Sequence, residues 1–293
     1  MSGVYGLGRF GEYMAGLEEH YAVIGGTACD ILLNASDLPF RATKDIDVVL
    51  MVEDRPAEVG RAIWKLLSDG GYAVARRGTE NAHFYRFSKP AASGFPSMVE
   101  LFGTEPNFIT EPDGLEIVPV PMGEDVSSLS AILLDADYYS FMCGGRKVVD
   151  GISVLGEAYL VPFKAKAFLD LRERRACGEH VDSKDLRKHK NDVFRLLQLF
   201  TPETTAPLPD SIRDDMSHFC NRRASQADWR KDDLGRGAGT DCPLIRSIEG
   251  LVHYRSQRSG RLGPISITAI WQGMARMLVA WESQAALFGL PCL

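Results

Sequence analysis

The chain has 293 residues, of which 45% are hydrophobic and 25% are charged, enough to bury the core of one large domain or two smaller ones. Lys and Arg number 33 against 39 Asp and Glu, and the formal net charge of -6 excludes the strongly basic character typical of general nucleic-acid binders. The six cysteines are scattered without a C-x-x-C motif, which favours reduced thiols and a cytoplasmic protein. We see no signal-peptide pattern and no apolar run of bilayer length, so we expect no membrane association.

Strand and helix signals alternate in the first half of the chain. A short apolar run at 22–26 ends in two glycines, and helical spacing follows at 27–35 and again at 57–71. Further strands are predicted at 45–52, 72–77, 83–88 and 98–102. Residues 103–155 are rich in Gly, Pro and Asp between β-prone pieces, which predicts hairpins. The sequence therefore predicts an α/β (α+β) domain over 1–155, with a mixed sheet and flanking helices.

Helical periodicity dominates the chain from about residue 156. Ser183 is a candidate N-cap for one of these helices, and a Pro- and Thr-rich linker stands at 201–209. The predicted helices are 161–176, 183–200, 211–225 and 265–287. We expect a helical C-terminal domain over 156–293.

Two aspartates stand in the strand that begins DIDVVL. Residues i and i+2 of a strand project to the same face, so Asp45 and Asp47 lie side by side while Ile46 faces the packed side. Two carboxylates on one face repel each other and are costly to desolvate, and a divalent cation such as Mg²⁺ removes that cost. A two-metal phosphoryl-transfer site takes a third carboxylate from a neighbouring strand, and Glu100 in MVELF is the candidate.

A purely structural interpretation of these carboxylates is also open. The D-x-D spacing occurs by chance, and both aspartates could be exposed at the start of a strand, with one of them paired to Arg41 or Lys44. Glu100 could likewise lie on a solvated face of the sheet.

The order of elements in GGTACDILLNASDLPFRATKDIDVVL favours the metal-binding interpretation over the structural one. A strand, a Gly-Gly pair, a helix, an acidic-x-acidic strand and a later acidic strand follow one another over roughly residues 20–102. In this order the sequence resembles the DNA polymerase beta superfamily of nucleotidyltransferases. The R-x-T-x-D-x-D pattern is similar, more narrowly, to the AbiEii type found in abortive-infection and toxin–antitoxin systems.

The resemblance implies roles for residues of the first half. Asp45, Asp47 and Glu100 would bind two Mg²⁺ ions and act in catalysis. Gly25 and Gly26 would let the backbone approach the triphosphate of an NTP substrate, although their alternative is an ordinary tight turn. Further candidate nucleotide-binding residues are Thr27, Arg41 and Lys44, with helix capping open for Thr27 and pairing to the aspartates open for the other two.

The resemblance also extends to two helices of the second half. In VPFKAKAFLDLRERR and KDLRKHKNDVFRL it points to Lys166 and Asp192 as catalytic residues and to Lys190 as a nucleotide-binding residue. Lys164 competes with Lys166 for its role. The alternative is that both segments are solvated helix faces, with Lys188 and Asp192 as an i,i+4 ion pair.

We expect a magnesium-dependent nucleotidyltransferase that moves a nucleoside monophosphate from an NTP to an acceptor hydroxyl. The family resemblance implies RNA, with tRNA first, as the acceptor of a toxin-like enzyme, and a cognate antitoxin as a partner. Segment 164–195 carries more Lys and Arg than Asp and Glu, which agrees with a polyanionic acceptor. The alternatives are a small-molecule transferase of the antibiotic type, a protein acceptor, or a regulator that binds a nucleotide without transfer.

Overall fold

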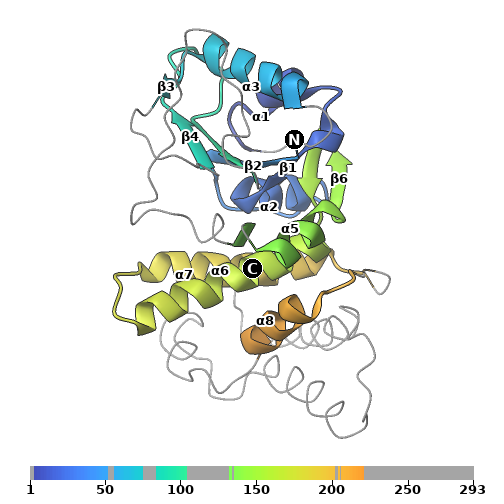
Figure 1. Ribbon diagram of the computed structural model, residues 1–293, viewed down its shortest axis with the longest axis vertical. Helices are drawn as coiled ribbons and strands as arrows, with labels where there is room; N and C mark the ends of the chain where they lie inside the picture. The colour runs from blue at the N-terminus through green and yellow to red at the C-terminus, as the bar shows by residue number, and fades with distance from the viewer. Residues whose placement is uncertain are drawn as a thin grey trace, which may run out of the picture. The chain divides into compact units, whose positions relative to one another are not determined.

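The structure is a computed structural model and describes residues 3–51, 56–74, 84–103, 132–133, 135–201, 204 and 206–220 (Figure 1). The chain forms two compact units, residues 1–163 and 164–293. The predicted domain boundary at 155/156 lies just before helix α6 (Glu157–Ala176), whereas the division between the units falls within that helix.

A seven-stranded mixed sheet forms the centre of the described part of the first unit, with the order β3-β4-β5-β2-β1-β7-β6. The strands are β1 (Tyr21–Ile24), β2 (Asp45–Leu50), β3 (Ala73–Val74), β4 (Phe84–Ser88), β5 (Met98–Phe102), β6 (Arg146–Val149) and β7 (Ile152–Leu155). The pairs β1/β7 and β2/β5 are parallel and the other pairs are antiparallel. The predicted mixed sheet with flanking helices is therefore confirmed.

Helices cover both faces of this sheet (Figure 1). Helix α1 (Leu7–Met14) and helix α3 (Pro56–Gly70) lie on one face, where Phe10 meets the Tyr21 ring and Trp64 meets the Phe87 ring edge to face. Helix α2 (Gly25–Asn34) lies on the opposite face and is buried from its first residue to Leu33. The two glycines predicted as a turn thus begin α2 directly after β1.

The end of the first unit combines a helix with a hairpin. Strands β6 and β7 form the hairpin predicted within 147–155, and Asp150 and Gly151 at its tip have φ of 49° and 77°. Helix α5 (Ala136–Cys143) contradicts the prediction of hairpins alone over 103–155. The Asp135 carboxylate accepts from two backbone amides and caps this helix, a signal that the β-prone residues around it obscured.

The described part of the second unit is helical, as predicted. It contains the rest of α6, then α7 (Ser183–Leu196), the 3-10 turn η2 (Leu197–Leu199) and α8 (Asp210–Cys220). Ser183 is not the N-cap of α7, because the Asp182 side chain accepts from the Lys184 amide at 2.8 Å instead. The predicted helix at 265–287 lies outside the described residues. Among the helices that the structure describes, none is long and apolar enough to cross a membrane.

Candidate functional site

Charged side chains align in one row across the central strands of the sheet. In the strand register, Arg86 of β4 lies opposite Glu100 of β5, Glu100 opposite Asp47 of β2, and Asp47 opposite Ile24 of β1. Residues opposite each other on paired strands project to the same face, and Asp45 projects there too because it is two residues before Asp47. The three predicted carboxylates therefore share the face of the sheet on which α2 lies.

The burial of these carboxylates increases along the row. Asp45 is exposed at the start of β2, Asp47 is partly buried, and only 7% of Glu100 is exposed. Glu100 Oε1 accepts a hydrogen bond from Arg86 Nε at 2.6 Å, within an ion pair between the two strands. The alternative of a solvated Glu100 is therefore wrong. In the part of the chain that the structure describes, no three His, Cys, Asp or Glu side chains group closely enough to hold a metal ion.

Gly25, the first residue of α2, lies against the row of carboxylates formed by Asp45, Asp47 and Glu100, which we call the acidic row. Its φ of +68° lies in the left-handed region, and a Cβ added there would fall 1.8 Å from Asp47 Oδ2. Only glycine fits such a close approach of backbone to a carboxylate. A Cβ on Gly26 would lie 3.0 Å from Thr43 Oγ1 and 3.3 Å from Arg41 Nη2. The two glycines thus bring the N-terminal backbone of α2 against Asp47 and the R-A-T segment.

Thr27 makes a contact that the sequence did not predict. It is fully buried, and its hydroxyl donates to the Asp45 backbone carbonyl at 2.6 Å. The hydroxyl therefore joins α2 to the first residue of β2 and does not cap the helix, whereas nucleotide binding by Thr27 stays a prediction. This bond fixes the backbone that carries the two aspartates.

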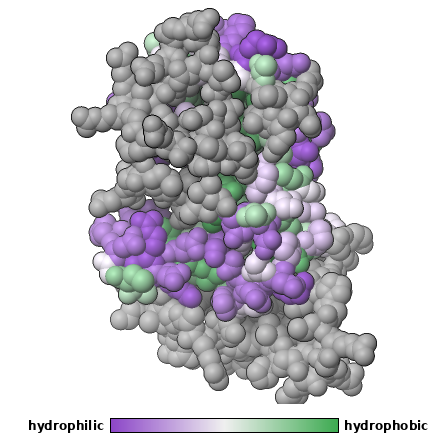
Figure 2. All heavy atoms as spheres, in the orientation of Figure 1, coloured by the Kyte–Doolittle hydropathy of each residue, from purple (hydrophilic) through white to green (hydrophobic). Residues whose placement is uncertain are grey.

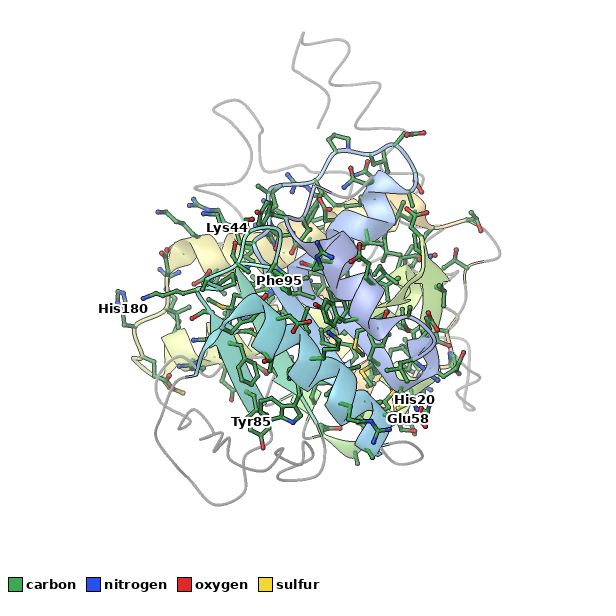
Figure 3. All side chains as sticks on the ribbon, turned by 90° about the horizontal axis from the view of Figure 1, so that it is seen from above. His20, Lys44, Glu58, Tyr85, Phe95 and His180 are labelled. Atoms are coloured by element: carbon green, nitrogen blue, oxygen red, sulfur yellow. The ribbon has the colours of Figure 1, made fainter. Side chains whose placement is uncertain are left out.

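The two basic residues before β2 differ in their surroundings. The Arg41 guanidinium lies over the Phe40 ring, 4.9 Å from its centroid, and next to Gly26. Lys44 is exposed immediately before the aspartates (Figure 3). Arg41 thus stands beside the amides at the start of α2, where an anion would be stabilised.

The second unit contains a buried ion pair between α6 and α7. Lys164 Nζ lies 3.1 Å from Asp192 Oδ2, with side-chain exposures of 5% and 1%. Lys164, the competitor of Lys166 in the sequence, is thus the lysine that pairs with Asp192, and an exposed pair of Lys188 with Asp192 is excluded because Asp192 is buried. The helical spacing alone does not decide between Lys164 and Lys166, since both lie on α6 and only packing shows which one faces α7.

Lys166 instead joins α6 to α8. Its Nζ lies 3.5 Å from Asp170 and 3.2 Å from Asp215. Burial works against its charged form, but the two carboxylates more than offset burial and raise the pKa of Lys166 above its ordinary value. Burial also raises the pKa of Asp170, against the opposing effect of Lys166. The contacts of Lys166 are those of a residue that holds helices together.

Lys190 is also buried, with 5% exposure, so two of the basic residues in segment 164–195 do not contribute to its surface. Lys184 and Lys188 of α7 and Arg175 near the end of α6 are exposed. Figure 2 shows hydrophilic residues gathered over α6 and α7. Segment 164–195 therefore exposes fewer Lys and Arg side chains than its sequence predicts.

The sequence analysis did not predict that Arg86 pairs with Glu100. Arg86 and Glu100 are each a single charge within an otherwise largely apolar strand, HFYRFS and MVELF. Antiparallel pairing of these two segments would have placed the charges opposite each other. That pairing is a long-range feature which the separate strand patterns do not contain.

The chain shows little similarity to known proteins. No protein-family model matches the sequence, and no curated protein matches it. A crystal structure of an antigenic nucleotidyltransferase-like protein from Paracoccidioides brasiliensis is similar to 76% of this chain and 90% of that chain, with a TM-score of 0.40 and 15% identity. A likeness at this level says nothing about function.

Proposed function

We propose that the chain is a magnesium-dependent nucleotidyltransferase whose catalytic centre is the face of β2 and β5 that carries Asp45, Asp47 and Glu100. The observation that carries this proposal is the register of the two parallel strands, which pairs Asp47 with Glu100 and puts Asp45 on the same face. Apolar residues would pack better than three carboxylates in this arrangement, so packing alone does not explain the carboxylates.

The carboxylates have the ligand chemistry that Mg²⁺ needs, but they do not yet group closely enough to hold an ion, so binding would require their side chains to turn toward one another. Carboxylate oxygens are the hard ligands that Mg²⁺ prefers, and Asp45 and Asp47 lie at the solvent-accessible end of the row. When bound there, two Mg²⁺ ions would neutralise the phosphate oxygens of an NTP and stabilise the attacking and leaving oxygens of an in-line displacement. Asp45 and Asp47 are the proposed ligands from β2, and Glu100 is the ligand from β5.

The start of α2 supports a phosphate site next to these carboxylates. Gly25 brings the backbone within contact of Asp47, and the amides of a helix N-terminus stabilise anions. Arg41 lies beside Gly26 and would neutralise a phosphate oxygen there. In the reaction, an acceptor hydroxyl oxygen loses its proton to solvent and forms a bond to the α-phosphorus, the bond from that phosphorus to the bridging oxygen breaks, and pyrophosphate leaves with the electron pair.

We propose RNA, with tRNA first, as the acceptor. The excess of Lys and Arg over Asp and Glu in segment 164–195 supports a polyanionic acceptor, although the exposed Arg175, Lys184 and Lys188 stand among the exposed carboxylates of Glu173, Glu179, Asp182 and Asp185. A toxin-like role with a cognate antitoxin belongs to the same proposal. Catalytic roles for Lys166 and Asp192 and nucleotide binding by Lys190 stay predictions, and the contacts of Lys166 with Asp170 and Asp215 favour a structural role for it.

The experiment incubates the purified protein with Mg²⁺, each of the four α-labelled NTPs in turn, and either total RNA or total protein. The Asp45→Asn/Asp47→Asn variant is run beside it, with folding checked by circular dichroism. Label that enters an RNA band only with intact aspartates supports the full proposal. Label in a protein or a small molecule keeps the transferase and corrects the acceptor, whereas equal label with the variant refutes the mechanism.

A further inference from the structure

The partner of Glu100 adds a feature to the site that the proposed function does not assign. Arg86 stands on β4, directly opposite Glu100 in the antiparallel register. Its Nε donates to Glu100 Oε1 at 2.6 Å, so one oxygen of the third carboxylate is already bound to a fixed cation. The sheet register thus places an arginine, a glutamate and an aspartate on three successive strands.

Burial makes this arginine necessary for Glu100. The Glu100 side chain is 9% exposed, whereas 31% of the Arg86 side chain is exposed. A carboxylate with so little solvent is costly to keep ionised unless a cation compensates it. Asp47 on the adjacent strand adds a second negative charge, because neighbouring strands lie only about 5 Å apart. Arg86 therefore offsets both the desolvation of Glu100 and its repulsion by Asp47.

A divalent cation bound between Asp47 and Glu100 would supply the same compensation. The arginine and the cation would then compete for one carboxylate, since both draw on the charge of Glu100 and since the two cations repel each other at short range. The ion pair that stabilises Glu100 without metal consequently weakens the binding of metal.

We propose that Arg86 is a positioning residue that serves as the internal counter-cation of Glu100, and that a divalent cation binds by displacing it. This inference rests on the proposed function, because it takes Glu100 as a metal ligand. Its consequence is that Arg86 sets the cation concentration at which the centre assembles. The rival is an ordinary strand-to-strand ion pair, which would persist with cation bound and leave the affinity for cations unchanged.

The test measures Mn²⁺ binding to the full chain by electron paramagnetic resonance, which reports free Mn²⁺. Arg86→Met removes the charge and keeps much of the apolar stem, and Arg86→Lys keeps the charge. Arg9→Met removes an exposed arginine that pairs with Glu12 on α1, and so controls for net charge. We expect Arg86→Met to lower the Mn²⁺ dissociation constant at least about tenfold, with the other two variants within about threefold of the wild type. An unchanged or higher dissociation constant for Arg86→Met overturns the inference.

A second readout follows the melting temperature in EDTA and in Mn²⁺. Arg86→Met should melt lower than the wild type in EDTA, because Glu100 loses its compensating charge, and should gain more on adding Mn²⁺. An equal or smaller gain contradicts the inference. If Arg86→Met does not fold in EDTA, Arg86→Gln replaces it in both measurements, since glutamine keeps a hydrogen-bond donor without the charge.

Asp47→Asn separates this inference from the proposed function. If Asp47→Asn binds Mn²⁺ as tightly as the wild type does, the metal site itself is wrong and the role of Arg86 falls with it. If Asp47→Asn loses binding while Arg86→Met does not tighten it, only the inference about Arg86 is wrong.

Discussion

Removing one partner of the buried Lys164–Asp192 pair is the sharpest perturbation that the second unit offers. Asp192→Leu leaves the Lys164 ammonium with 5% of its side chain exposed and without the carboxylate that lies 3.1 Å away. Breaking a buried pair in this way costs about 3–5 kcal/mol, because the buried ammonium loses a carboxylate that solvent does not replace. That loss is a large fraction of the roughly 5–15 kcal/mol by which folded proteins are stable.

The assay is urea denaturation followed by far-ultraviolet circular dichroism, which gives the free energy of unfolding. The double variant Lys164→Met/Asp192→Leu removes both charges, and we expect it to recover most of the stability that Asp192→Leu loses. The matched control is the exposed pair of Lys65 and Asp69, which is shorter at 2.6 Å. Asp69→Asn should leave the free energy of unfolding nearly unchanged, since solvent screens that pair and the amide oxygen still accepts from the Tyr13 hydroxyl, which lies 2.6 Å from Asp69 Oδ2.

Two results would contradict this prediction. Asp192→Leu could cost less than about 1 kcal/mol of unfolding free energy, or the loss in the double variant could equal the sum of the losses in Lys164→Met and in Asp192→Leu. Either result would mean that burial does not isolate the pair from solvent.

Three further predictions concern single residues. Gly25→Ala should lower the free energy of unfolding by about 2 kcal/mol or more, and by more than Gly16→Ala, because both have positive φ but only Gly25 lies against a carboxylate. Thr27→Val should cost about 1–2 kcal/mol by removing the bond to the Asp45 carbonyl, and Thr27→Ser should retain most of the stability. Burial raises the pKa of Asp170 above 3.8, so wild-type stability falls as pH rises from 3.8 through that raised pKa, and Asp170→Asn should become more stable relative to the wild type over the same rise in pH. Urea denaturation checks all three predictions, and for Asp170→Asn it is repeated at several pH values. A change in the free energy of unfolding in the opposite direction would show that the assigned contact does not determine the stability.

Local sequence patterns predicted the elements that carry the site. The apolar alternation around Asp45 and Asp47 defines β2, and the short run around Glu100 defines β5, because each strand is long enough to show its own pattern. Helix α1 was missed although Leu7, Phe10 and Met14 have helical spacing, since three glycines within residues 6–11 lower its helical propensity.

Partners could not be predicted, because they depend on pairing between distant segments. The alignment of Arg86 with Glu100 follows from the β4/β5 register, and the choice of Lys164 over Lys166 follows from the packing of α6 on α7. Thr27 likewise bonds a carbonyl 18 residues away. Each of these contacts is specified by tertiary structure, which the spacing of residues along one element does not encode.

The central claim is tested most directly by the rate at which a nucleoside monophosphate moves from an α-labelled NTP to the proposed RNA acceptor in the presence of Mg²⁺. Asp47→Asn is compared with Asp37→Asn, an exposed aspartate with φ of 57°, a conformation that asparagine also adopts. Metal coordination is worth several kcal/mol in the transition state, so we predict a loss of about a hundredfold or more for Asp47→Asn and an unchanged rate for Asp37→Asn. Transfer by a folded Asp47→Asn protein at the wild-type rate would contradict the account.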